Sequence, residues 1–262
     1  MYRPVKRFFD FFISLFAIII FLPFYIILPI FIAILLGRPV FFRQKRVGRY
    51  NKIFYLYKFR SMNNKTDKNG ELLPDEDRLT SFGKLLRKSS LDELPQLFSI
   101  LVGNMSIVGP RPKTVEEICL IEDTTYASRQ CVRPGITGLA VIKGRNELEP
   151  DKAFRVDLEY VANMNLSLDL KIFILTFIVV LFKKGVTSKN HVTFVPHYIF
   201  WEEIGVKNND EIKACRNKAR ILVDSDARYV NAMSKDDFNI SRQELIKKYK
   251  IRGKKNGKRK RI

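Results

Sequence analysis

The sequence predicts a mainly helical α+β protein, with an N-terminal re-entrant membrane helix, a small β-hairpin and interfacial amphipathic helices. Three observations predict it: a long uncharged run near the start, two short stretches rich in β-branched and aromatic residues, and later helical segments separated by Gly/Pro loops. The chain has 262 residues, of which 46% are apolar. It is therefore long enough to bury a core, and its composition excludes a disordered chain.

The first element is a run of 26 uncharged residues, Phe11 to Leu36. As a helix it would be long enough to cross the roughly 30 Å of a bilayer's hydrocarbon core. The run is too long for a signal peptide, and no small-residue cleavage site follows it. Pro23 lies in its middle and Pro29 follows, so we expect a kink near Pro23.

Both flanks of this run are basic, and cytoplasmic flanks are the ones that carry excess Lys and Arg. A single kinked span would place one cluster on the wrong side, whereas a helix that bends near Pro23 and returns keeps both inside. The residues alone leave both topologies open and favour the re-entrant one. The flanking cations are Arg3, Lys6 and Arg7 before the run and Arg38, Arg43, Lys45, Arg46 and Arg49 after it.

A β-hairpin is expected next, from Pro39–Arg43 and Lys52–Arg60 on either side of Gly48. Residues 63–78 are polar and read as an exposed loop. A helix should then begin near Thr80 and run through Leu86.

A second helix is expected from Leu91 to Leu101, where Ser90 as N-cap and Glu93 three residues later form a capping box. Residues 103–112 and 133–138 read as Gly/Pro loops, and 114–131 and 151–164 as helices.

The run from Ile172 to Phe182 is too short to span a bilayer. It predicts either a buried helix or one that lies in the membrane interface. We expect three parts: residues 1–37 as the re-entrant helix with its basic flank, 38–186 as a cytoplasmic catalytic domain, and 187–262 as a basic extension. Residues 247–262 hold ten Lys or Arg and no acid, and we expect the final stretch RGKKNGKRKRI to be disordered.

The net charge of +20 points to an anionic partner, which leaves phosphate ligands, anionic lipids and nucleic acid open. The three cysteines, Cys119, Cys131 and Cys215, form no CxxC pair. This spacing argues against a disulfide framework and against a cysteine zinc site.

Adjacent carboxylates, Asp92 and Glu93, lie within LLRKSSLDELPQL. Acids often occupy the first turn of a helix because they complement its dipole. The cations nearby favour a second interpretation, in which a carboxylate among cations stays ionised and serves as a nucleophile or metal ligand.

Cations beside Gly/Pro loops suggest a phosphate site close to the membrane surface. Each one alone could be a solvated surface charge, but arginine suits planar, bidentate phosphate recognition, and turn N–H groups can bind anions. A phosphorylated or diphosphate substrate is therefore expected. The cations concerned are Lys58, Arg60, Arg87, Arg111 and Arg145.

The ordered motifs KRFFD, GRPVFFRQKRVG, KFRSM, LRKSSLDELPQL, MSIVGPRP, RPGITGLA and GRN resemble those of the bacterial sugar transferase family, over about residues 3–185. These are the monotopic polyprenyl-phosphate phosphoglycosyl transferases, and the chain looks like their short form. The resemblance implies a re-entrant helix bent at the proline that Pro23 matches. It also implies a bacterial inner-membrane enzyme whose catalytic domain faces the cytoplasm.

What the resemblance implies for the chemistry is phosphosugar transfer from a UDP-sugar to undecaprenyl phosphate, with release of UMP. It starts assembly of a capsule, O-antigen, exopolysaccharide or glycoprotein glycan. Asp92 matches the nucleophile of a covalent aspartyl-phosphosugar intermediate and Glu93 its dyad partner, and Mg²⁺ is implied at Asp92. The remaining residues matched to phosphate or nucleotide binding are Lys58, Arg60, Arg87, Pro110, Arg111, Pro112 and Arg145.

Two positions depart from the family pattern: Leu22 replaces a serine before the bending proline, and Val141 replaces a glutamine. Two other function classes remain as alternatives, a membrane-tethered nucleic-acid-binding protein and an inactive scaffold of the same fold. The Asp92–Glu93 pair argues against the scaffold, and no nucleic-acid fold is recognised. We expect anionic lipids as further partners; the sugar, the glycan pathway and a homo-oligomeric state stay open.

Overall fold

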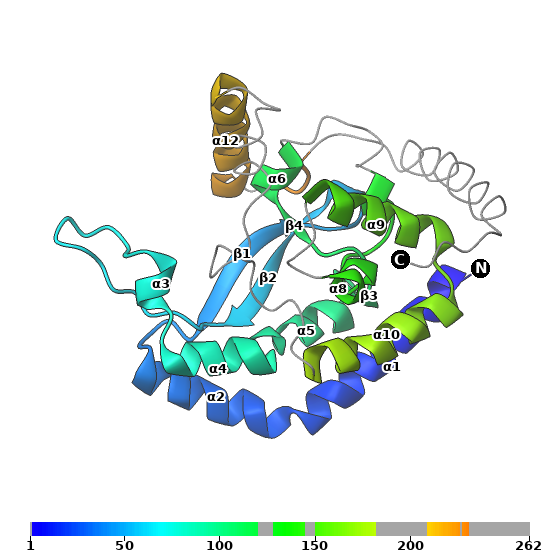
Figure 1. Ribbon diagram of the computed structural model, residues 1–262, viewed down its shortest axis with the longest axis horizontal. Helices are drawn as coiled ribbons and strands as arrows, with labels where there is room; N and C mark the ends of the chain where they lie inside the picture. Colours follow the sequence, from blue (N-terminus) through cyan, green and yellow to red (C-terminus); the bar gives the residue numbers. More distant parts are fainter. Residues whose placement is uncertain (1, 120–127, 145–149, 182–208, 226, 231–262) are drawn as a thin grey trace.

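The structure is a computed structural model that describes residues 2–119, 128–144, 150–181, 209–225 and 227–230. It is mainly helical with small sheets, as predicted (Figure 1). The helical elements, where η marks a 3-10 turn, are α1 (Tyr2–Ile20), α2 (Leu22–Leu35), η1 (Arg49–Asn51), α3 (Asp75–Arg78), α4 (Ser81–Ser89), η2 (Leu91–Glu93), α5 (Gln96–Leu101), α6 (Val115–Cys119), η3 (Ser128–Cys131), α8 (Leu139–Lys143), α9 (Pro150–Asn163), α10 (Leu166–Leu181) and α12 (Asn209–Asp224). The strands are β1 (Phe41–Val47), β2 (Ile53–Phe59), β3 (Ser106–Val108), β4 (Lys113–Thr114) and β5 (Gly135–Thr137).

The N-terminal run forms two helices, α1 and α2, bent by 60° relative to each other at Phe21. Pro23 lies in the first turn of α2, where a missing N–H is tolerated, so the predicted kink is confirmed and the break precedes the proline. Within the described residues neither helix alone has the length and apolarity for a membrane span, whereas the bent pair together meets both criteria.

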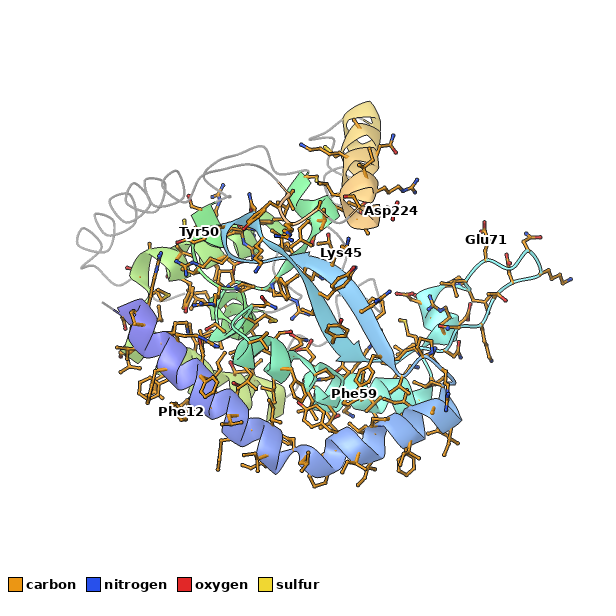
Figure 2. All side chains as sticks on the ribbon, turned by 180° about the vertical axis from the view of Figure 1, so that it is seen from behind. Phe12, Lys45, Tyr50, Phe59, Glu71 and Asp224 are labelled. Carbon is orange, nitrogen blue, oxygen red and sulfur yellow. The ribbon has the colours of Figure 1, made fainter. Side chains whose placement is uncertain are left out.

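The bent pair forms the underside of the molecule, and α4, α5 and α10 lie along it (Figure 1). Its outer face is apolar and uncovered: Phe16, Ile26 and Ile34 are 65%, 61% and 73% exposed. Figure 2 shows Phe12 on this outer side. Ile32 on the inner face is fully buried. One apolar face of the pair therefore packs on the rest of the protein, while the other is an exposed apolar surface of the kind that contacts a membrane or a partner.

Polar side chains attach this pair to the rest of the chain. Arg7 donates to the carbonyl oxygens of Ile100 and Leu101, both at 2.6 Å, at the end of α5. The carboxylate of Asp10, which is 3% exposed, accepts the backbone N–H of Ile107 at 3.0 Å. These contacts satisfy buried polar groups at the point where α1 meets β3.

Arg60 makes the corresponding attachment at the far end of α2. Its guanidinium donates to the carbonyl oxygens of Leu36 and Gly37, and to that of Arg38 at 3.0 Å. The last carbonyls of a helix have no partner within the helix, so a buried arginine here caps α2 and fixes the chain as it leaves it.

The hairpin is confirmed, with β1 and β2 antiparallel and Phe41 opposite Phe59. A third strand, β4, pairs with β1 to give the order β2-β1-β4. The expected loops 103–112 and 133–138 each contain a short strand, because β3 and β5 pair in parallel. Glycine makes this approach possible: a Cβ on Gly135 would lie 2.1 Å from the Gly109 nitrogen.

The helix predicted from Thr80 is confirmed as α4, with the Thr80 hydroxyl accepting the N–H of Gly83 at 3.1 Å. The predicted helix from Leu91 to Leu101 and its capping box are wrong. Ser90 is left-handed, with φ 58°, and ends α4 without a side-chain cap. The segment is split into η2 and α5 because Pro95 starts a new helix.

Further along, α9 confirms the helix predicted over 151–164. The helix predicted over 114–131 is replaced, in its described parts, by the short α6 and η3. The apolar run from Ile172 belongs to α10, which is both buried and exposed: Ile172 is 0% exposed, whereas Ile174 and Phe177 are 52% and 57% exposed.

The C-terminal extension contributes one described helix, α12, which packs against α6 (Figure 1). Ala219 and Val230 from the extension are buried in one cluster with Val47, Val115 and Ile118. The basic end over residues 247–262 lies outside the described residues, and the predicted domain limits remain predictions.

Replacing Arg60 by glutamine should lower the free energy of unfolding by about 1–3 kcal/mol, because buried carbonyls at the end of α2 would lose their donors. The measurement is thermal unfolding of the detergent-solubilised protein. The matched control is Arg43→Gln, which removes an exposed guanidinium from β1. Equal melting temperatures for both variants would contradict the capping role.

Candidate functional site

Two adjacent carboxylates lie in the turn that joins α4 to α5. The left-handed Ser90 ends α4, and Asp92 and Glu93 follow in η2 before Pro95 starts α5. Asp92 is 7% exposed, so it is buried although it lies in a turn. The local sequence therefore places both acids in a tight connection between two helices rather than along the face of one helix.

Cations from two other segments surround Glu93. Lys58 near the end of β2 places its Nζ 2.6 Å from Glu93 Oε1. Arg111 places a terminal nitrogen 3.6 Å from the same oxygen. Because Lys58 and Glu93 are 22% and 16% exposed while Arg111 is 52% exposed, the pair is partly enclosed and Arg111 lies on its open side.

Burial and the neighbouring Glu93 raise the pKa of Asp92 to about 6, against the opposing effect of Lys58, Arg87 and Arg111. Desolvation thus outweighs the attraction of the surrounding cations and makes the carboxylate less acidic, but it does not overturn the expectation that the group stays ionised. Asp92 is still mainly ionised at neutral pH. It is also a stronger base than a solvated aspartate.

Arg87 is held in place by Ser61, whose hydroxyl accepts its Nε–H at 2.9 Å. Burial lowers the pKa of Arg87, and the nearby Asp92 acts in the opposite direction. Arg87 on α4 and Lys58 on β2 thus approach the two carboxylates from different elements.

The Pro110–Pro112 segment presents Arg111 between two buried prolines. All three of its carbonyl oxygens are bound: Pro110 accepts the Gly135 N–H at 2.9 Å, Arg111 accepts Arg129 at 2.7 Å, and Pro112 accepts Arg46 at 3.2 Å. The backbone is fixed on one side, so the exposed Arg111 side chain extends from a rigid support.

Buried ion pairs next to the Pro110–Pro112 segment help to hold its backbone, and the sequence analysis did not predict them. Arg129 pairs with Asp157 at 2.7 Å, with side chains 3% and 6% exposed, and Lys113 pairs with Glu117 at 3.1 Å. Asp157 could have been found, because it is an acid beside the apolar Phe154 and Leu158 of α9. Nothing in the local sequence distinguishes Arg129.

Two predicted residues do not join this cluster. Arg60 follows the end of β2 and binds the carbonyls after α2 instead of facing Glu93. Pro23 lies at the helix bend. The prediction for Arg145 falls outside the described residues. The structure brings together Asp92, Glu93, Lys58, Arg87 and Arg111, supported by the buried Pro110 and Pro112.

Among the described residues, no group of three or more His, Cys, Asp or Glu could hold a metal ion. Mg²⁺ is commonly bound by only one or two carboxylates together with substrate phosphates and water. The Asp92 carboxylate fits that requirement if a diphosphate supplies the other oxygens. The neighbouring Glu93 has one oxygen already occupied by Lys58.

Sequence comparisons agree with this geometry. The family model described as bacterial sugar transferase matches residues 1–183. The chain is 50% identical over 158 residues, 60% of its length and 78% of the relative, to the uncharacterized sugar transferase EpsL of Bacillus subtilis. It is 34% identical over 204 residues, 70% of its length and 90% of the relative, to the exopolysaccharide production protein ExoY of Rhizobium meliloti.

A longer relative is the UDP-glucose:undecaprenyl-phosphate glucose-1-phosphate transferase of Xanthomonas campestris, 41% identical over 172 residues. The alignment covers 60% of this chain but only 36% of that protein, so the match spans about a third of the longer relative. The region matched by the family model, residues 1–183, contains the bent helix pair, both described sheets and the carboxylate cluster. The chain belongs to the bacterial sugar transferase family.

Proposed function

We propose that this protein is a polyprenyl-phosphate phosphoglycosyl transferase. It transfers a phosphosugar from a UDP-sugar to undecaprenyl phosphate, releases UMP, and starts a membrane-associated glycan. The observation that carries the proposal is the buried Asp92 beside Glu93, with Lys58, Arg87 and Arg111 around them. The names of relatives supply the substrate classes, since one is a UDP-glucose:undecaprenyl-phosphate transferase and another an undecaprenyl-phosphate galactose phosphotransferase.

In the first step an Asp92 carboxylate oxygen attacks the phosphorus next to the sugar. The bond between that phosphorus and the bridging oxygen of the diphosphate breaks, and UMP leaves with the bridging oxygen. The product is a phosphosugar covalently attached to Asp92. Arg111 and Lys58, the cations that contact Glu93, would stabilise the negative charge that builds up on the leaving phosphate.

In the second step a phosphate oxygen of undecaprenyl phosphate attacks the same phosphorus, and the bond to Asp92 breaks. Undecaprenyl-diphosphate-sugar forms and the carboxylate is regenerated. Glu93 accepts the proton of an acceptor phosphate that arrives protonated, and Lys58, 2.6 Å from Glu93, fixes the position of its carboxylate. Mg²⁺ bound by Asp92 with the diphosphate would neutralise charge on the donor and on the departing UMP.

The position of the turn suits substrates from two phases. Leu85 on α4, Phe98 on α5 and Val102 directly after α5 are 61%, 46% and 70% exposed. Both helices that flank the carboxylates therefore offer apolar side chains to a bilayer, next to the uncovered face of α1 and α2. A lipid phosphate in the bilayer and a soluble nucleotide would both reach the two carboxylates at the membrane surface. We place the enzyme at the bacterial cytoplasmic membrane with its catalytic domain in the cytoplasm.

UMP should be released from one UDP-sugar of a panel even without undecaprenyl phosphate, because the first step needs only Asp92. Asp92→Asn should abolish this release, by about 10³-fold or more, since an amide does not act as the nucleophile. Asp224→Asn, an exposed change on α12, is the matched control. An absolute requirement for the lipid acceptor before any UMP appears would refute the covalent intermediate.

The single-turnover rate of UMP release should fall as the pH drops through about 6, because the raised pKa of Asp92 makes its carboxylate neutral below that value. Lys58→Met removes a cation that lowers this pKa, so the midpoint should move to higher pH. The measurement is the pH profile of the burst of UMP. A midpoint near 4 in the unmodified enzyme would contradict an Asp92 nucleophile in this environment.

The re-entrant topology predicts that both ends of the bent pair lie in the cytoplasm, because both carry basic residues. In a variant whose three native cysteines are replaced by alanine, Val5→Cys near the start of α1 and Phe42→Cys in β1, after α2, place thiols at exposed positions. In intact spheroplasts a membrane-impermeant maleimide should label neither thiol, and after permeabilisation it should label both. Labelling of either one from outside would show a span.

A further inference from the structure

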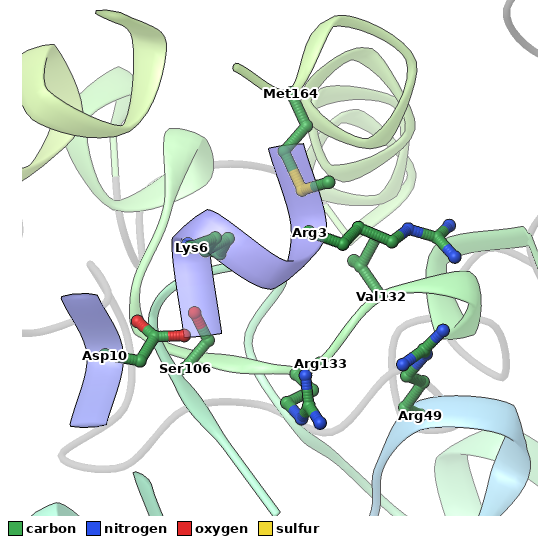
Figure 3. Close-up of a pocket in the computed structure, with 8 residues that line it drawn as sticks. All are labelled: Arg3, Lys6, Asp10, Arg49, Ser106, Val132, Arg133 and Met164. Atoms are coloured by element: carbon green, nitrogen blue, oxygen red, sulfur yellow. The ribbon is translucent and has the colours of Figure 1, made fainter. Parts of the chain in front are cut away.

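A second cationic site lies at the start of α1, away from the two carboxylates (Figure 3). This pocket, here called the α1 pocket, is lined by Arg3 and Lys6 of α1, by Arg49 of η1, and by Arg133 just before β5. Val132 and Met164 complete its apolar wall. Figure 3 shows the side chains of Arg3, Arg49 and Arg133, which come from three separate segments that line the pocket.

The three arginines retain unused donors. A terminal nitrogen of Arg3 is buried and has no hydrogen-bond partner among the described residues. Arg133 donates through Nε to the Gly103 carbonyl at 2.7 Å, and Arg49 donates through Nε to the Cys131 carbonyl at 3.2 Å. These bonds fix two of the guanidinium groups, and Arg49 also donates a terminal N–H to the Tyr50 hydroxyl, while the remaining terminal N–H groups stay available for a ligand.

The carboxylates near the α1 pocket offset only part of its positive charge. Lys6 pairs with Asp169 at 2.5 Å, and among the described residues that line the pocket Asp10 is the one carboxylate beside Arg3, Arg49 and Arg133. Burial lowers the pKa of Arg133, and its cationic neighbours Arg49 and Arg7 act in the same direction, against the opposing effect of Asp10. Arginines that repel each other at short range gain free energy when an anion binds between them.

The α1 pocket and the carboxylate cluster lie at opposite ends of the short parallel pair β3–β5. Ser106 begins β3 and lines the pocket, whereas Arg111 follows the other end of β3. Beside the pocket, Val5 and Phe8 on the outer face of α1 are 47% and 59% exposed. The pocket therefore lies next to the N-terminal end of the apolar outer face of α1.

We propose that the α1 pocket binds the phosphate of an anionic phospholipid headgroup. Planar guanidinium groups bind phosphate through paired N–H donors, and three of them from three segments enclose a single phosphate. The lipid's acyl chains would lie along the apolar outer face of α1. A headgroup held there would fix the first turn of α1 at the membrane surface.

The probe is dihexanoyl phosphatidylglycerol, added to the full-length protein in dodecyl maltoside micelles, which contain no phosphate. Lipid adducts are counted by native mass spectrometry. Arg3→Gln is the informative variant because its terminal nitrogen has no partner to lose, and it should weaken binding about tenfold. Arg3→Lys, which keeps the charge but not the fork, should restore only part of the affinity.

The matched control is Arg228→Gln, which removes an exposed guanidinium outside the pocket. Equal losses in Arg3→Gln and Arg228→Gln would show a general effect of charge and overturn the proposal. Inorganic phosphate that displaces the lipid at equal concentration would assign the pocket to a soluble phosphate and overturn the lipid source. The binding measurement uses no sugar donor, so Asp92→Asn should bind the lipid normally whatever its activity.

Discussion

The attachment of an apolar helix pair to a polar domain is the constraint on which the rest of the structure depends. The pair leaves its outer apolar face uncovered, so its attachment to the rest of the protein depends on contacts near its two ends. Those contacts need buried side chains that make strong hydrogen bonds. Arginine does this at both ends, through Arg7 on the carbonyls that end α5 and Arg60 on those that follow α2. These contacts fix the position of α4, α5 and the turn between them relative to the uncovered apolar face of α1 and α2.

The carboxylate site uses this placement. Burying Asp92 costs free energy in its charged form, and the three nearby cations offset part of that cost. The result is a carboxylate that is mainly ionised near neutral pH yet more basic than one in water. The support for Arg111 comes from below, where ion pairs such as Arg129–Asp157 hold the backbone of the Pro110–Pro112 segment.

Local patterns predicted what depends on local physics. The hairpin, α4 and α9 follow from side-chain periodicity and from caps such as Thr80. The strands β3 and β5 were missed because each has only three residues, and they are stabilised by pairing between segments far apart in the chain. Asp92 and Glu93 were found from their composition and surroundings, but the raised pKa of Asp92 depends on burial that no local pattern contains.

Lys58 and Arg60, two residues apart, also show that a local pattern does not predict contacts set by the tertiary structure. By alternation they would share one face of β2, but the strand ends at Phe59, so Arg60 turns to the carbonyls after α2 while Lys58 remains beside Glu93. A strand's last residue is set by its partner, here Phe41, and not by its own sequence.

The packing of α12 on α6 affects how the folded unit should be delimited. The family match ends at residue 183, yet Ala219 and Val230 share an apolar cluster with Val115, and the Arg228 carbonyl accepts the N–H of Ile53 at 2.8 Å. A chain cut at the end of the matched region would expose that cluster to water. The end of the family match at residue 183 is thus not the end of the packed unit, because residues beyond it contribute to the same apolar cluster.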